Sequence, residues 1–403
     1  MSDEPSSFRQ DPIRTLRAWW TDTERADRLV YGAIAAVVVL LTVGVAIGSI
    51  GIRYVAGLLV LVAMYSLLTT GLNVQWGYAG LINFSVIAFW GIGAYTAMLV
   101  SSANSPLELG WHPATAIPLA IMAGTVVAVF IGIPTLRLRE DYLAIASLGL
   151  AEVVRLILLN ERQWTAGSQG ISGIPVPLSW LPLGTRTVVL LIGAVLLLAV
   201  YLFARRIHRS PWGRVQRTVR ADEDLAEALG KDSYRLKMQA FVIGSVVMTL
   251  SGVLYVFYAQ FLGPADLLPL ETFYVWVALI LGGTGSDRGA LLGGAVIVLI
   301  REGTRFLSGT TAFDLLQTGL EVVGILTHIN TASLRLFAVG VLIVLVIRYR
   351  PEGLLPPREE LIWPDAKRRA DISTDRRAAH GDAPGAVSEP VPETGSDDEG
   401  GER

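Results

Sequence analysis

Long apolar runs that are nearly free of charged residues dominate this chain and constrain its fold more than any other feature. A helix needs roughly 20 apolar residues to cross the hydrocarbon core of a bilayer, which is about 30 Å thick. The candidate spans are Tyr31–Ile50, Tyr54–Leu72, Leu81–Val100, Thr115–Pro134, Tyr142–Leu159, Thr187–Ala204, Met238–Leu262, the double-length Leu267–Ile300, and Leu334–Ile347. Because a backbone inside lipid must satisfy its own hydrogen bonds, each run is expected to form a helix. The sequence therefore predicts an all-α integral membrane protein.

The composition supports this class and excludes several others. Of the 403 residues, 52% are hydrophobic and 17% are charged, whereas a soluble domain carries about a quarter charged residues. The chain has no cysteine, which excludes disulfides, thiolate catalysis and thiolate metal sites. Its four histidines lack the spacing that lets two imidazoles share a metal. No metal site is expected, and the net charge of -2 gives no indication of a nucleic-acid partner.

Lysine and arginine residues collect in segments that indicate which side of the membrane each loop faces, because cytoplasmic loops carry an excess of them. The segment 205–237 holds nine, whereas the loops 101–113 and 263–271 hold none. Counting crossings outward from the central segment places both termini in the cytoplasm, provided that Leu267–Ile300 crosses twice. The self-consistent prediction is about ten transmembrane helices.

The two ends of the chain differ in character from the apolar middle. Residues 1–30 are polar, lack the apolar core of a secretory signal, and are expected to form a cytoplasmic segment. Asp11–Arg28 can be read either as an amphipathic helix on the membrane surface or as part of a plain tail. Residues 31–349 are expected to form the transmembrane domain, including the cytoplasmic loop 205–237. Residues 350–403 are expected to be a cytoplasmic, largely disordered acidic tail, because they cannot bury enough apolar surface.

The central cytoplasmic segment carries the most informative local signal. Its stretch Gly213–Leu229 has helical composition, and Gly230 follows as a stop signal. Charged side chains decorate the predicted helix, namely Arg217, Arg220, Glu223 and Glu227. A short charged helix beneath the membrane suits docking in a groove of a cytoplasmic partner. The residues alone leave open the alternative of a loop helix held against lipid headgroups.

Polar side chains interrupt the apolar sequence between Gly71 and Val86. They are Asn73, Gln75, Tyr78, Asn83 and Ser85, interleaved with two glycines. Irregular backbone at membrane depth is tolerated only against protein or beside a water-filled cavity. These residues therefore predict either the lining of a translocation pathway or a set of interhelical hydrogen bonds with close glycine packing.

Glu152 and Arg155 place two opposite charges inside the span Tyr142–Leu159. Each charge at mid-helix costs roughly 2.5–3.5 kcal/mol on insertion scales. At a spacing of three residues the two side chains share a helix face and can pair, which reduces the penalty. The pair is a candidate for the lining of a polar pathway, and a structural ion pair inside the bundle is the alternative.

Several catalytic signatures are missing from the sequence. The glycine-rich run 282–289 lacks the lysine of a phosphate-binding loop. Neither a serine nucleophile elbow nor an aspartate-rich diphosphate motif occurs. The chain is therefore not expected to be an enzyme, to bind a cofactor or to hydrolyse ATP by itself.

Six stretches of the sequence together carry a resemblance to a known family. They are GLNVQWGYAGLINFSVIAFWGIGAYTA (Gly71–Ala97), RLREDYLAIASLGLAEVVR (Arg137–Arg155), GSQGISGIP (Gly167–Pro175), GRVQRTVRADEDLAEALGKDSYRLKMQAF (Gly213–Phe241), LGGTGSDRGALLGG (Leu281–Gly294) and YRPEGL (Tyr349–Leu354). In this order they resemble the permease subunits of branched-chain amino-acid ATP-binding-cassette (ABC) importers, specifically the longer of the two usual permeases. The family carries a Gly-Glu-x-x-Arg-like element where this chain has Ala151, Glu152 and Arg155, so the charged pair matches although the glycine does not.

The resemblance implies a type II importer-like fold of ten helices in the plasma membrane. It also implies a second permease subunit, cytoplasmic ABC ATPase subunits that use ATP, and an extracytoplasmic solute-binding protein. The family's coupling element maps to Gly213–Gly230, with Glu227, Ala228 and Gly230 as its matching core. The implied function is the inward transport of branched-chain or related amino acids.

A self-sufficient secondary transporter of amino acids or similar small polar solutes is the alternative function. Such a protein needs its own ion-binding groups near the midplane of the membrane. Glu152 is the only good acidic candidate in the sequence. The sequence does not specify which amino acid is carried.

Overall fold

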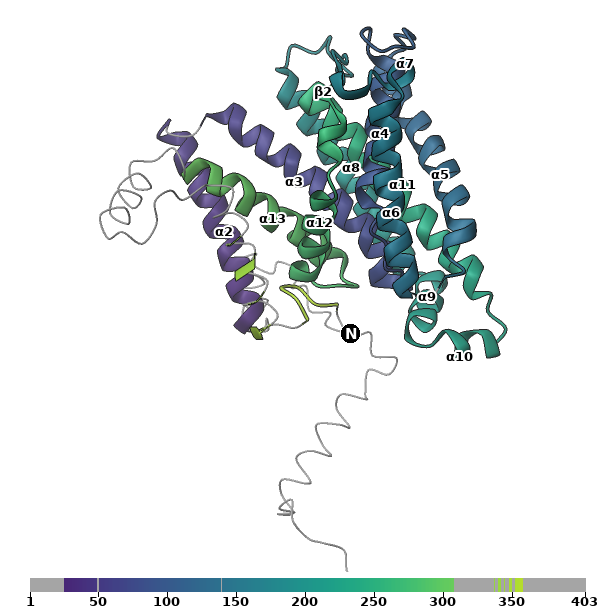
Figure 1. The fold of residues 1–403 in the computed structure, drawn as a ribbon. Coiled ribbons are helices and arrows are strands. Elements are labelled where there is room, and N and C mark those ends of the chain that lie inside the picture. The colour runs from purple at the N-terminus through teal and green to yellow at the C-terminus, as the bar shows by residue number, and fades with distance from the viewer. Residues whose placement is uncertain are drawn as a thin grey trace, which may run out of the picture. The chain divides into compact units, whose positions relative to one another are not determined.

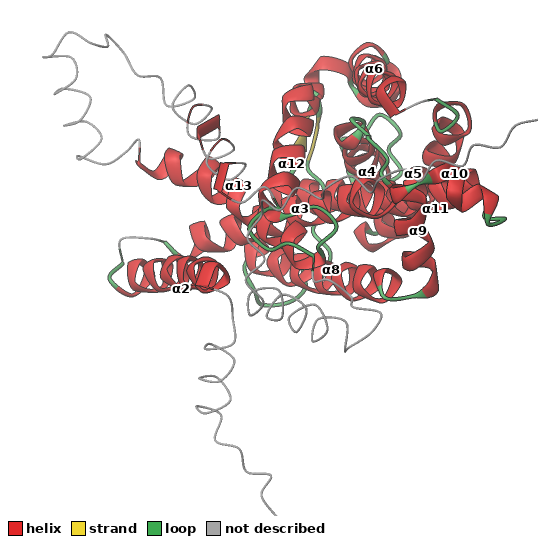
Figure 2. Ribbon diagram, turned by 90° about the horizontal axis from the view of Figure 1, so that it is seen from below, coloured by secondary structure: helices red, strands yellow, loops and turns green. Residues whose placement is uncertain are grey.

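The computed structural model describes residues 25–48, 51–138, 140–307 and 352–357, together with isolated positions between 337 and 349. This part of the chain is a bundle of helices joined by short connections (Figures 1 and 2). The main helices are α2 (Arg25–Ala46), α3 (Ile52–Leu72), η1 (Asn73–Tyr78), α4 (Val86–Ser101), α5 (Ala116–Thr135), α6 (Glu140–Asn160), α8 (Thr185–His208), α9 (Pro211–Ala221), α10 (Glu223–Ala228), α11 (Ser233–Ala259), α12 (Pro269–Gly282) and α13 (Asp287–Leu307).

Five of the described helices are long and apolar enough to cross a membrane, and two more are apolar but shorter. The five are Ile52–Tyr78, Pro113–Thr135, Asp141–Asn160, Thr185–His208 and Ser233–Ala259, and the shorter two are α4 and α12. These helices confirm the predicted all-α integral membrane class. The count of about ten crossings and the cytoplasmic position of both termini stay predictions. The predicted span Leu334–Ile347 and most of the tail 350–403 lie outside the described residues, as does most of the segment 1–30.

Several predicted boundaries differ from the structure. The predicted span Met238–Leu262 is wrong at both ends, because α11 already begins at Ser233 and ends at Ala259, where Gln260 turns into the left-handed region and Phe261–Leu262 form a short strand. The first apolar helix begins at Arg25 instead of Tyr31. The predicted span Leu81–Val100 is wrong at its start, because α4 begins only at Val86. The backbone before it turns at Gly80, whose φ of +73° favours glycine. The side chain of Asn83 then accepts a hydrogen bond from the backbone N–H of Ser85, at 2.8 Å, which holds this stretch in a non-helical form.

The double-length block Leu267–Ile300 forms two helices, as predicted, with a turn at residues 283–286. Glycines bring α12 and α13 into close contact. A Cβ atom added at Gly282 would lie 2.0 Å from the carbonyl oxygen of Gly289, and one at Gly293 would lie 1.9 Å from that of Ala278. The G-x-x-x-G spacing at 289 and 293 is therefore a helix-packing device, as expected.

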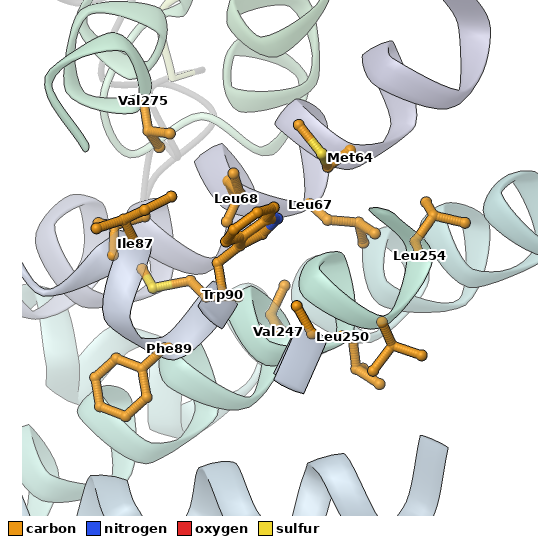
Figure 3. Close-up of a cluster of buried hydrophobic side chains, with 14 of the residues drawn as sticks. Met64, Leu67, Leu68, Ile87, Phe89, Trp90, Val247, Leu250, Leu254 and Val275 are labelled. Atoms are coloured by element: carbon orange, nitrogen blue, oxygen red, sulfur yellow. The ribbon is translucent and has the colours of Figure 1, made fainter. Parts of the chain in front are cut away.

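Helix α11 lies in the middle of the core and packs against α3, α4 and α5. Figure 3 shows side chains of α3, α4 and α11 interleaved in this core, among them Leu67, Trp90 and Leu254. Glycine again permits the approach, because a Cβ atom at Gly252 would lie 1.9 Å from the carbonyl oxygen of Trp90. Helices α4 and α11 therefore lie close enough for their backbones to be in contact.

The two ends of α11 lead to different structures at opposite ends of the bundle (Figure 1). Its first residue, Ser233, follows α9 and α10. Its last residue, Ala259, precedes the short strand β2 (Phe261–Leu262), which pairs antiparallel with β1 (Ile171–Ser172). The distribution of lysine and arginine predicts that the α9–α10 end faces the cytoplasm.

Candidate functional site: the coupling segment and the central polar network

The segment between α8 and α11 forms two short helices and not the single helix predicted over Gly213–Leu229. Ser210 caps α9 by accepting a hydrogen bond from the backbone N–H of Gly213. The chain becomes extended at Asp222, with φ -159° and ψ 106°, and the Asp222 carboxylate then caps α10 by accepting from the N–H of Leu225 at 2.9 Å. An aspartate in this role ends one helix and starts the next, which composition alone does not distinguish from a continuous helix. We call residues 211–230 the coupling segment.

Two of the three arginines of α9, Arg217 and Arg220, form hydrogen bonds back to the membrane helices. The guanidinium of Arg220 donates a hydrogen bond to the backbone carbonyl of Gly77 in η1. Arg217 donates to the carbonyl of His208, at 3.3 Å, at the end of α8. Gly213 allows the tight turn from α8, because a Cβ atom there would lie 2.3 Å from the same His208 carbonyl. Helix α9 is thereby fixed to two membrane helices.

The acidic residues of α10 point toward α11. Glu223 forms an ion pair with Lys237 at 2.5 Å, and Glu227 accepts a hydrogen bond from the hydroxyl of Ser233. Ala228 ends α10, and Gly230 follows with a φ of +75°, the left-handed conformation that favours glycine. Apolar side chains instead occupy the open face of α10, where Leu225 is 52% exposed and Leu229 is 66% exposed.

The residues Asn73–Tyr78 continue α3 as a π-helix. The side chains of Gln75, Asn83 and Ser85 form a fully buried hydrogen-bond network, and Asn73 is equally buried. Gln75 donates to the carbonyl of Phe241 at 2.9 Å and accepts from Asn83 at 2.8 Å. Asn83 in turn accepts from the hydroxyl of Ser85 at 2.5 Å.

The same network reaches the α12–α13 hairpin. The Asn73 side-chain oxygen accepts a hydrogen bond from the backbone N–H of Gly285 at 2.8 Å, and the indole of Trp276 donates to the carbonyl of Asn83 at 3.1 Å. Of the two interpretations of these polar residues, interhelical hydrogen bonding describes the contacts that they make here. Their role as a pathway lining stays a prediction.

Tyr78 belongs to a separate polar cluster at the α9 end of the bundle. Its hydroxyl donates a hydrogen bond to Asp287, the first residue of α13. His208 lies 3.3 Å from the other carboxylate oxygen of Asp287. Its ring is tilted by 50° against that of Tyr78, with centroids 4.6 Å apart. Sequence reasoning missed His208 and Asp287, since positions 79 residues apart carry no local signal of their contact.

Glu152 and Arg155 form the predicted ion pair on α6. The guanidinium makes two parallel bonds to the carboxylate, at 2.9 Å and 2.5 Å. The Glu152 side chain is nevertheless 38% exposed and that of Arg155 21% exposed. Helix α6 is the least buried of the five long apolar helices, with 17% of its apolar window buried. The pair therefore lies on a face that this chain itself covers poorly.

An apolar helical bundle with a short helical segment fixed to its polar centre defines a multi-pass membrane permease. Within the described residues no group of three or more His, Asp or Glu side chains is placed to hold a metal ion. Residues 54–347 match the family model described as the branched-chain amino acid transport system permease component, and the chain belongs to this family. Its place is therefore the plasma membrane.

Relatives from bacteria and archaea show the same similarity. The high-affinity branched-chain amino acid transport system permease protein LivM of Escherichia coli K12 is 31% identical, over 79% of this chain and 74% of the relative. The probable LivM protein of Methanocaldococcus jannaschii is 28% identical over 77% of this chain and 95% of the relative. The permease protein LivH of Escherichia coli K12 is 26% identical over 58% of this chain and 79% of the relative. No solved structure matches the chain.

Proposed function

We propose that this chain is the longer membrane subunit of an ABC importer that carries branched-chain or related amino acids into the cell. It works with a second permease subunit, with cytoplasmic ATPase subunits that use ATP, and with an extracytoplasmic solute-binding protein. The chain binds no cofactor of its own. Similarity to LivM over most of both chains supports this function, and the similarity to LivH supports a second permease subunit.

The observation that carries the coupling role is the way in which the coupling segment is held. Charged side chains of α9 and α10, among them Arg220 and Glu223, contact the membrane helices, while Leu225 and Leu229 are exposed. Exposed apolar side chains ringed by polar residues are typical of a protein interface. We assign this apolar face to the groove of the ATPase subunit.

The contact between Arg220 and Gly77 offers a direct route for movement of α9 into the membrane domain. Gly77 lies in the π-helix, and π-helical turns are frequent at functional sites. From there the Gln75 side chain contacts α11 and Asn83. A displacement of α9 by the ATPase would therefore reach α11 and the non-helical start of α4, in addition to the flanking helices α8 and α11 themselves.

The face of α6 that carries Glu152 and Arg155 is assigned to the second permease subunit. A charged pair at mid-helix that faces lipid would cost several kcal/mol, at roughly 2.5–3.5 kcal/mol for each charge. Cover by a second subunit, or by water in a pathway between the two subunits, removes this cost. This placement makes the pair part of the pathway wall in the assembled importer.

Reconstitution tests the proposal and separates it from a secondary transporter. We expect uptake of radiolabelled leucine by proteoliposomes only when both permeases, the ATPases, the binding protein and ATP are present. Uptake by this chain alone, driven by an ion gradient, would contradict the proposal. For the docking face, the double variant Leu225→Ser with Leu229→Ser should lose ATPase binding in a pull-down assay. Leu107→Ser, at an equally exposed leucine of the opposite loop, is the matched control.

A further inference from the structure

A cavity of about 340 Å³ lies among α3, α4, α11, α12 and α13, toward the end of the bundle opposite the coupling segment. Helices α3, α4, α11 and α13 each contribute residues from one face, spaced three or four positions apart, and α12 contributes Glu271. On α3 these include Leu61 and Leu68, and on α13 they include Val298 and Arg301. The cavity is formed by residues of a single permease chain.

The cavity has an apolar side and a charged side. Leu61, Leu68 and Ile87 provide apolar surface. Figure 3 shows Leu68 of α3 close to Trp90 of α4. Ile87, which lines the cavity, follows Ser85 by two residues in the chain. Its backbone N–H donates a hydrogen bond to the hydroxyl of Thr272 at 3.3 Å. The cavity thus extends from the outer loop to the start of the central polar network.

The charged side centres on a bidentate ion pair. Arg301 bonds both carboxylate oxygens of Glu271, at 2.6 Å and 3.1 Å, and the hydroxyl of Tyr65 donates to the same carboxylate at 2.5 Å. Asp266 and Glu302 also line the cavity. The carboxylates of Glu271 and Asp266 therefore accompany the guanidinium of Arg301 in a partly buried space.

Two further features favour a ligand over a purely structural ion pair. Ionisable side chains within membrane segments usually mark substrate or ion paths, because their burial is costly. A structural pair needs neither an adjoining cavity nor additional carboxylates. Moreover, the indole N–H of Trp90, which lines the cavity, is buried without an acceptor among the described residues. An unpaired buried donor is unfavourable, and a ligand oxygen would satisfy it.

We propose that this cavity binds the zwitterion of an apolar α-amino acid on its way to the central network. The ammonium group lies toward the carboxylates of Glu271 and Asp266, the ligand carboxylate lies toward Arg301, and the side chain lies against Leu61, Leu68 and Ile87. This inference rests on the proposed function and adds a substrate site within this one chain.

The first experiment measures binding of radiolabelled leucine to the purified importer, with both permeases and the ATPases but without the solute-binding protein. We expect saturable binding that unlabelled leucine displaces. Competitors that lack one charge, 4-methylpentanoate and 3-methylbutylamine, should displace it at least about tenfold less well, since each loses a charge-assisted hydrogen bond. Absence of saturable binding, or equal displacement by either competitor, would overturn the inference.

Two variants localise the site by different means. Asp266→Asn removes a charge while keeping an acceptor for the Gly263 N–H, which Asp266 bonds at 2.9 Å; it should weaken binding about tenfold. Val298→Phe should fill the cavity and abolish binding. Their matched controls are Glu108→Gln in the outer loop and Val126→Phe on the exposed face of α5. Should Val298→Phe fail to assemble, Asp266→Asn tests the site alone.

Uptake with the binding protein and ATP present separates this inference from the proposed function. If the wild-type importer transports leucine and both cavity variants bind and transport it normally, only the cavity site is wrong. If the complete wild-type assembly transports no branched-chain amino acid, the proposed function is wrong as well.

Discussion

The guanidinium of Arg220 donates a hydrogen bond to the backbone carbonyl of Gly77, which joins helix α9 to a π-helix inside the bundle. The two residues are 143 positions apart in the chain. No side chain could replace the hydrogen of Gly77, because a Cβ atom would lie 2.0 Å from the side-chain oxygen of Asn73. The glycine thus lets the π-helix, the α12–α13 turn and the arginine meet at one point.

Replacing Arg220 by glutamine should uncouple transport from ATP hydrolysis. Glutamine is too short to keep the contact with Gly77, so movement of α9 would no longer reach the π-helix directly. We expect ATP-dependent leucine uptake to fall by roughly tenfold, which corresponds to a typical coupling free energy between two sites. ATPase binding and basal hydrolysis should persist, and Arg214→Gln, on the exposed face of the same helix, should transport normally. Normal uptake by the Arg220 variant would contradict this route.

Asp222 and Gly230 set the two ends of α10. Asp222→Ala removes the cap of α10, at a cost of about 1 kcal/mol, and should therefore fray the helix that presents Leu225 and Leu229. Gly230→Ala places a side chain at a φ of +75°, where about 1–2 kcal/mol of strain is expected. Surface plasmon resonance against the ATPase should show weaker binding for both variants. Asp232→Ala, at the start of α11, provides a comparison in which α10 is intact.

The central network should contribute to stability even without substrate. Gln75→Leu leaves the carbonyl of Phe241 and the amide of Asn83 without their partner. Each unsatisfied buried group costs about 1–3 kcal/mol, so the melting temperature of the detergent-purified protein should fall by several degrees. Gln163→Leu, at an exposed position, is the control. An unchanged melting temperature for the Gln75 variant would show that the network is not structurally important.

The packing of α4 against α11 requires a glycine at position 252. A valine there would force its Cβ atom to within 1.9 Å of the Trp90 carbonyl and push the two helices apart. Overpacking of this kind costs about 1–3 kcal/mol or more, so Gly252→Val should reduce the yield of monodisperse protein in size-exclusion chromatography. Gly149→Ala has open space around it and should be harmless. Equal yields for the two variants would contradict this packing.

Burial, together with the neighbouring carboxylate of Glu271, raises the pKa of Asp266 above its ordinary value, while a hydrogen bond from the Gly263 backbone opposes the shift. A carboxyl group whose folded pKa is raised stabilises the fold fully below its unfolded pKa of about 3.9. That contribution is lost as the pH rises through the folded pKa.

Asp266→Asn should abolish this pH-dependent loss of stability, because the asparagine side chain stays neutral. The melting temperature of the variant should therefore rise relative to wild type as the pH increases from about 4 to about 7. Thermal melts of both proteins across that range provide the measurement. A difference that stays constant with pH would show that Asp266 titrates in the folded protein as it does in the unfolded chain.

Much of the fold could be predicted because the bilayer imposes simple rules on sequence. Apolar runs such as Thr187–Ala204 are long and uninterrupted, and the structure extends that run to α8, Thr185–His208, by only a few residues at each end. The glycines between α12 and α13 likewise indicated a turn. Predicted helix boundaries were wrong where a side-chain hydrogen bond overrides the local composition. Asp222 caps a new helix, and Asn83 holds the backbone in a non-helical form.

The candidate site could be predicted in part. The sequence singled out Gln75 and Asn83 as unsuited to lipid, but it left open what they contact. It also singled out Glu223 and Glu227 as charges on a cytoplasmic helix, without indicating that both face α11. The ion pair of Glu152 with Arg155 could be predicted from the sequence because its partners are three residues apart on one helix.

The sequence by itself determined that this chain is a helical membrane protein, which segments are apolar enough to cross, and which family it resembles. These properties depend on the solvent preference of each residue and on spacings within one helix. Only the tertiary structure decided that Arg220 contacts Gly77, that Tyr78 contacts Asp287, and that Arg301 pairs with Glu271 beside a cavity. Such pairs come from helices far apart in the chain, and their distances are set by how whole helices pack, which no local pattern of residues encodes.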